Sequence, residues 1–132
     1  MFEVKDNFIN EEEHLIIQNV LESTNFPWYF QKHSVVSDPQ NKFDCHLGHN
    51  FYLNDNVTSD FFKLLNPIIE KLKVNSLIRT KGNLTFGTNK QSKSAPHVDQ
   101  TFDCKVALYY LGTNNGHTII KNEKVKSIKN RI

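Results

Sequence analysis

The first third of the chain shows one helical pattern of apolar residues between two stretches that favour strands. Residues 2–9 alternate loosely between apolar and polar side chains, which predicts a short strand. Asn10 precedes three glutamates, so its side chain can cap a helix and Glu13 can complete a capping box. Residues 11–23 are expected to form that helix, with an apolar face made of Leu15, Ile16 and Val20, and Ile17 and Leu21 beside them. After Pro27, residues 28–36 are aromatic and β-branched and predict a second strand.

The middle of the chain predicts a further short strand and an interrupted helix. Residues 49–55 read as the strand. Thr58 or Ser59 can cap the helix, whose buried face would hold Phe61, Phe62, Leu65, Ile68, Ile69 and Leu72. Pro67 lies inside this pattern. It must kink or split the helix, because proline lacks a backbone N–H group and crowds the preceding turn.

The last third of the chain favours antiparallel strands. The pattern predicts strands over residues 83–86, 105–111 and 118–121, and another strand begins within residues 125–132. Asn114, Asn115 and Gly116 separate two of them, and an Asn-Gly pair between β-rich stretches is a strong hairpin signal. Helices first and antiparallel strands afterwards predict an α+β fold built on a sheet or barrel.

Length and composition indicate a single ordinary globular domain over residues 1–132, because 38% of the residues are apolar and 23% are charged. The net charge of +2 comes from well-mixed charges, without the basic stripe that nucleic-acid binding would need. No apolar stretch approaches the ~20 residues of a membrane span, and the N-terminus lacks the apolar core of a secretory signal. Two cysteines are too few for a disulfide scaffold, which favours reduced thiols and a cytoplasmic protein.

His97 and Asp99 carry the clearest candidate chemistry. In an extended segment, residues two apart face the same side, so both side chains can project together while Val98 turns into the core. An imidazole nitrogen and a carboxylate oxygen are ligands that Fe(II) accepts, and a second histidine completes such a set in facial iron sites. The alternative is a surface histidine beside a turn aspartate, because a bare H-x-D pattern is short and occurs by chance.

Residues 96–118, PHVDQTFDCKVALYYLGTNNGHT, resemble the first half of the double-stranded β-helix of Fe(II)- and 2-oxoglutarate-dependent oxygenases. The similarity is greatest to the prolyl-hydroxylase-like branch and to short members carried by marine phages. Residues 2–13 and 25–31 also look like that branch, so the resemblance covers essentially the whole chain. It implies a jelly roll with flanking N-terminal helices, in the cytoplasm of a phage-infected or marine bacterial host. The implied reaction uses dioxygen to hydroxylate a C–H bond, such as that of a prolyl or other peptidyl side chain, and releases succinate and CO2.

The resemblance assigns roles position by position. It implies that His97 and Asp99 hold the iron, and it assigns no catalytic residue beyond the metal site. Tyr110 matches a tyrosine whose hydroxyl can hydrogen-bond the far carboxylate of 2-oxoglutarate. Leu84 lies in the region that walls the cosubstrate pocket, and Thr118 matches the turn that follows the strand containing Tyr110.

The sequence departs from the family at the distal end of the site. The family takes its third iron ligand from a later histidine, and a nearby Arg or Lys pairs with 2-oxoglutarate. The one histidine after Asp99 is His117, which falls in the turn and does not match that ligand. By location alone, Arg79 and Asn83 are further pocket candidates. The sequence therefore looks like a jelly roll whose C-terminal strands are missing from this chain.

Other interpretations remain open. A truncated, catalytically inactive jelly-roll remnant could act as a binding or structural module, and an open sheet edge could favour self-association or pairing with strands from another polypeptide. Cys45, His46 and His49 form a soft cluster, but zinc sites usually pair two such clusters, so loop histidines are the better interpretation. The aromatic residues 28–30 could stack on a ligand, although core packing is far more common for such a triplet.

Overall fold

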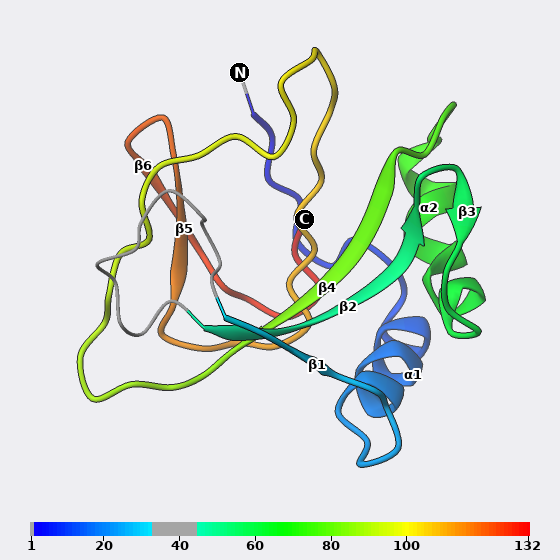
Figure 1. The fold of residues 1–132 in the computed structure, drawn as a ribbon, viewed down its shortest axis with the longest axis horizontal. Coiled ribbons are helices and arrows are strands. Elements are labelled where there is room, and N and C mark those ends of the chain that lie inside the picture. The colour runs from blue at the N-terminus through cyan, green and yellow to red at the C-terminus, as the bar shows by residue number, and fades with distance from the viewer. Residues whose placement is uncertain (1, 33–44) are drawn as a thin grey trace. The chain divides into compact units, whose positions relative to one another are not determined.

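The computed structural model describes residues 2–32 and 45–132, which form a mixed α+β fold with two small antiparallel sheets and few helices (Figure 1). Two compact units can be distinguished within it. The first comprises Met1–Phe26, Lys63–Val74 and Lys105–Ile132, and the second comprises Pro27–Phe62 and Asn75–Cys104. A single domain over residues 1–132 stays a prediction.

The second unit is built around the long strand β2, His46–Leu53. Strand β4, Arg79–Thr85, runs antiparallel along one edge of β2. The opposite edge carries β1, Tyr29–Gln31, at one end and β3, Asn56–Val57, at the other (Figure 1). These strands confirm the expected strands over residues 49–55 and 83–86. The strand expected over residues 28–36 is confirmed at β1, and its last four residues lie outside the described part of the chain.

Helix α1, Glu11–Leu21, opens the first unit and begins as the sequence predicts. The Asn10 side chain accepts a hydrogen bond from the Glu13 N–H at 2.8 Å. The predicted buried face is confirmed at Ile17 and Leu21, but the third buried residue of the helix is His14 rather than Leu15 or Ile16. Two residues of the predicted face are largely exposed, Leu15 at 42% and Ile16 at 52%. The buried face of the helix includes the polar residue His14, so the positions of the apolar residues alone do not predict which face is buried.

The second helical region is split at the expected place. A 3-10 turn, η1 (Phe62–Leu65), leads directly into α2 (Asn66–Leu72), and Pro67 stands in the first turn of α2. A missing N–H is harmless there, because the first turn has no intrahelical acceptor for it. The helix ends where Lys73 takes a left-handed conformation with φ of 52°. Leu65 and Ile68 are buried, whereas Leu72 is exposed.

The C-terminal hairpin of the structure lies at a turn that the sequence did not predict. Strands β5, His117–Ile120, and β6, Glu123–Lys126, pair antiparallel across Lys121 and Asn122 (Figure 1). Both turn residues have positive φ, 49° and 70°, which matches the twist of a two-residue hairpin. The strand expected over residues 118–121 is thus confirmed to within one residue. The hairpin expected at Asn114–Gly116 is wrong: the Asn114 side chain accepts the Gly116 N–H at 2.7 Å and makes a local turn instead.

Two further predicted strands are wrong for a common reason. Residues 105–111 make a single bridge, in which Tyr110 pairs with Arg131, and residues 2–9 contain no regular strand. Val106 and Leu108 stay 65% and 44% exposed. Apolar alternation shows that a segment can be a strand, but a strand also needs a partner along its length. Among the described residues, only Tyr110 of residues 105–111 pairs with another segment, through its bridge to Arg131.

Asn130 ties the two ends of the first unit together. Its side-chain amide donates to the Ile9 carbonyl at 2.8 Å, and its oxygen accepts the Ile9 N–H at 3.0 Å. The Tyr109 hydroxyl donates to the same oxygen at 3.0 Å. Asn130 is 1% exposed and has φ of 57°, a conformation that asparagine tolerates better than most residues. Around it, Lys5 and Ile132 exchange two backbone hydrogen bonds, at 2.8 and 3.0 Å.

His14 extends this network into α1. Its Nδ1 lies 2.6 Å from the Tyr109 hydroxyl. Because the tyrosine donates its one proton to Asn130, its oxygen accepts the Nδ1–H of His14, and Nε2 is left as a lone pair. Nε2 is buried without a hydrogen-bond partner among the described residues. Burial lowers the pKa of His14 from 6.5 and raises that of Tyr109 well above its ordinary value.

We expect Asn130→Ala to destabilise the first unit by about 2–4 kcal/mol, because it leaves the buried N–H and C=O groups of Ile9 without partners. The measurement is urea unfolding followed by the helical circular dichroism signal. Asn19→Ala, on the exposed side of α1, is the matched control and should change the stability little. An Asn130→Ala protein as stable as the control would contradict the role of the amide.

His14 should make the first unit sensitive to acid. Its folded pKa is lowered, so below about pH 6.5 the unfolded chain takes up a proton that the buried imidazole excludes. Stability is therefore retained above that pH and lost as the pH falls, by at most about 1.4 kcal/mol per pH unit. The urea midpoint at pH 7.5 and 5.5 measures this. His14→Gln should flatten the difference, whereas His117→Gln, at an exposed position in β5, should not.

Candidate functional site

His97 and Asp99 face each other in the second unit, in the irregular segment after β4. The His97 Nε2 lies 3.6 Å from the Asp99 Oδ1, and the two side chains are 47% and 39% exposed. The His97 Nδ1 lies 3.1 Å from the Ala95 carbonyl oxygen. A carbonyl only accepts, so in the neutral imidazole Nδ1 carries the hydrogen and Nε2 presents a lone pair to the carboxylate. The imidazole lone pair and the carboxylate oxygen that face each other are two ligands that one metal ion could share.

Arg79, at the start of β4, holds the other side of this carboxylate. Its Nη2 lies 3.2 Å from the Asp99 Oδ2 and leaves Oδ1 to face the histidine. In metal sites, ligating histidines commonly donate their second N–H to a carbonyl, and ligating carboxylates are themselves hydrogen-bonded. Ala95 and Arg79 supply both kinds of support. Neither partner was predicted as such, because the sequence places Arg79 in the pocket by location alone.

Lys81 adds a second cation to the same face of β4, two residues after Arg79. Its Nζ donates to the Nε2 of the buried His46 at 3.3 Å. Burial lowers the pKa of Lys81, and the neighbouring Arg79 lowers it further, while Asp99 opposes both. Its stem lies over Gly48 of β2, where a β-carbon would come within 3.0 Å of the Lys81 Cε. The region around Asp99 is therefore positively charged.

The other predicted site residues are placed in two groups. Leu84 lies on β4 directly opposite Leu47 of β2, and strand alternation turns it to the face opposite Arg79 and Lys81. Tyr110 and Thr118 belong to the first unit, and the Tyr110 hydroxyl donates to the Thr118 Oγ1 at 2.7 Å. The two residues are thus in contact with each other, and their binding of a cosubstrate stays a prediction. Their proximity to His97 and Asp99 stays a prediction.

Within residues 2–32 and 45–132, no group of three or more His, Cys, Asp or Glu side chains could hold a metal ion. The pair of His97 and Asp99 thus offers two ligands of a set. In the soft cluster, Cys45 is a free thiol, and His46 and His49 stand three residues apart on β2, which turns them to opposite faces. None of the helices in the described residues has the length and apolar character to cross a membrane.

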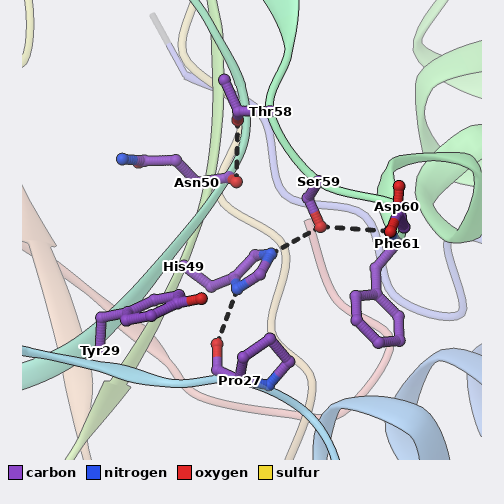
Figure 2. A pocket seen from close by; sticks show the side chains of 8 residues that line it. All are labelled: Pro27, Tyr29, His49, Asn50, Thr58, Ser59, Asp60 and Phe61. Carbon is purple, nitrogen blue, oxygen red and sulfur yellow. Dashed lines mark hydrogen bonds between the residues drawn. The ribbon is translucent and has the colours of Figure 1, made fainter.

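A second polar arrangement lies in a pocket of the second unit that the sequence did not reveal (Figure 2). His49 hydrogen-bonds Ser59 on one side and the Pro27 carbonyl on the other, at 2.7 Å each. The sequence indicates a loop or strand histidine and a helix cap at these two positions. The loop interpretation is wrong, because His46 and His49 lie on β2 and are each 5% exposed. The backbone path that brings them together passes through β2 and β3, and no local motif encodes it.

A comparison with protein-family models, with curated proteins and with solved structures finds no match to this chain. The assignment of function therefore depends on the residues and geometry of the site and on the sequence resemblance.

The ion pair between Arg79 and Asp99 should contribute little to folding. Both side chains are more than a third exposed, 34% and 39%, and such pairs are worth roughly 0.2–1 kcal/mol. Arg79→Gln should therefore lower the free energy of unfolding by no more than about 1 kcal/mol, and the difference should shrink in high salt. Urea unfolding at low and high ionic strength measures both. A large, salt-independent loss would mean that Arg79 is a structural residue rather than a support for Asp99.

Proposed function

We propose that this chain is a non-haem Fe(II)- and 2-oxoglutarate-dependent dioxygenase, of the prolyl-hydroxylase-like branch, in which His97 and Asp99 are two of the iron ligands. The observation that carries the proposal is the convergence of the His97 Nε2 lone pair and the Asp99 Oδ1 at 3.6 Å. The two sheets and the flanking helices would then be part of a jelly roll. This fold assignment rests on the resemblance of residues 96–118 to that family.

The donor set is suited to the metal. One imidazole nitrogen and one carboxylate oxygen are ligands that Fe(II) accepts, and the third would come from outside the described residues. His97 and Asp99 would hold the ion, while Ala95 fixes the imidazole tautomer and Arg79 orients the carboxylate. Iron with 2-oxoglutarate and dioxygen supplies the oxidising power for C–H hydroxylation, and the protein supplies binding and orientation.

The cosubstrate assignments follow the resemblance. Tyr110 would donate its hydroxyl proton to the far carboxylate of 2-oxoglutarate, and it would give up its bond to Thr118 to do so. Thr118 could then donate its own hydroxyl proton to the same carboxylate. Leu84 would contribute an apolar wall. A carboxylate that accepts charge-assisted hydrogen bonds of this kind is held more strongly than a neutral acceptor. A peptidyl side chain is the proposed substrate.

The test is a titration of the purified 132-residue chain with Mn(II), without oxygen and with 2-oxoglutarate present. We expect weak binding, because two ligands are available where the family uses three. His97→Ala and Asp99→Ala should each weaken it by at least 10-fold, since even the loss of a residue that supports a ligand costs roughly 10–100-fold. His117→Gln is the matched control, because it removes a histidine of the first unit. Equal binding by all four proteins would refute the assignment.

Turnover separates the enzyme from the inactive remnant. We expect little succinate from this chain with Fe(II), 2-oxoglutarate and oxygen, because a third ligand and a cation for the cosubstrate are still needed. If metal binding depends on His97 and Asp99 but no succinate is released, the result fits an oxygenase site that needs a further ligand. Tight stoichiometric metal binding with steady succinate release would show that a further ligand is supplied, for instance by a second copy of the chain.

A further inference from the structure

The pocket around His49 and Ser59 has a chemistry that the oxygenase proposal does not use. We propose that Ser59 is a nucleophile activated by His49, and that this pocket accepts an acyl group from an ester. The arrangement is a hydroxyl, an imidazole and a backbone carbonyl in line, from the Ser59 Oγ through His49 to the Pro27 oxygen (Figure 2). A nucleophile beside a base that a third group orients is the signature of covalent catalysis.

The hydrogen-bond partners fix the direction of the protons. The Pro27 carbonyl can only accept, so the His49 Nδ1 donates to it at 2.7 Å. In the neutral imidazole, Nε2 then carries a lone pair and accepts the Ser59 hydroxyl proton at 2.7 Å. His49 is thus held in the tautomer that a general base requires. The separation is within the 2.6–3.2 Å reach expected of a base and the proton it removes.

Two further contacts favour the reactive form of the serine. The Phe61 backbone N–H donates to the Ser59 Oγ at 3.1 Å, so it holds the hydroxyl oxygen in place while its proton is directed at His49. Aromatic rings restrain the imidazole, which is 5% exposed. The Tyr29 ring stacks on the His49 ring with 6.0 Å between the two ring centroids, and the centroid of the Phe51 ring lies 4.7 Å from that of His49. A fixed, mostly buried base loses little entropy when it takes the proton.

The pocket has room for a small acyl donor. Its volume is about 360 Å³, near the lower end for small-molecule sites. Tyr29, Asp60 and Phe61 are among its lining residues. In Figure 2, Ser59 and His49 face each other from two sides of this space, whereas the Asn50 side chain points away from them. The negative charge of Asp60 disfavours anionic donors by charge repulsion, so the proposed substrates are neutral or cationic esters.

The step balances within the pocket. The Ser59 Oγ forms a bond to the ester carbonyl carbon while its proton moves to the His49 Nε2. The bond from that carbon to the leaving alkoxy oxygen breaks, and the proton passes from Nε2 to the departing group. The products are the O-acyl serine and the free alcohol, and no oxidant or metal takes part.

The experiment uses p-nitrophenyl acetate with the full chain and no added metal, so it is independent of the oxygenase proposal. We expect a stoichiometric burst of p-nitrophenol and an acetyl group on Ser59 by peptide mass spectrometry. Ser59→Ala should abolish both. His49→Gln should slow the burst by roughly 100-fold or more, the usual contribution of a general base. The matched control is Ser23→Ala, which removes an exposed serine whose hydroxyl donates to the Val20 carbonyl, and it should react like the unmodified chain.

A second variant keeps the test decisive if His49→Gln does not fold. In Ser59→Cys, the imidazole should promote ionisation of the new thiol, so iodoacetamide should alkylate it at least 10-fold faster than the half-buried Cys45 and Cys104 of the same protein. Equal alkylation of the three thiols would overturn the proposal. Acetylation of Ser59 no faster than that of Ser23, or a burst that survives in Ser59→Ala, would overturn it as well.

Discussion

The amide of Asn130 is the contact on which the first unit depends. One side chain satisfies both backbone groups of the buried Ile9, accepts the Tyr109 hydroxyl, and through that hydroxyl fixes the tautomer of His14 on α1. Buried polar groups are costly unless they are paired, so each member of this network needs the others. Next to this network, the Arg131 guanidinium donates to the Asp6 carboxylate twice, from Nε to Oδ1 at 2.6 Å and from Nη2 to Oδ2 at 2.9 Å. These contacts are exposed at Asp6 and are worth far less than the amide.

Features that depend on neighbours in sequence were predictable. Asn10 caps α1 and Pro67 divides the second helical region because both effects act within one turn of the chain. Features that depend on a distant partner were not. The alternation in residues 105–111 contains no information about whether a strand lies beside them, and the buried face of α1 depends on Tyr109, which is 95 residues away from His14.

The same distinction applies to the candidate sites. A spacing of two places His97 and Asp99 on one side of an extended segment, so their convergence was predictable from the sequence. The expectation that Val98 between them turns into the core was wrong, because Val98 is 79% exposed. The support of Asp99 by Arg79 depends on how the segment after β4 returns toward that strand. His49 and Ser59 are ten residues apart, and they meet only because β2 turns into β3 and the chain then passes back. Residue types and spacing therefore identify ligand pairs more readily than they identify a base and its nucleophile.

The hydrogen bonds between Ile9 and Asn130 join residues that are 121 positions apart. A loop of that size closes late, because its entropy must be lost before any of these contacts can form. On a ribosome that adds 5–20 residues per second, α1 is synthesised roughly ten seconds before its partner. During that interval the face of α1 formed by His14, Ile17 and Leu21 has none of its final neighbours from residues 109–130. Until residues 109–130 have been synthesised, this face of α1 is therefore exposed to association with chaperones or with other nascent chains.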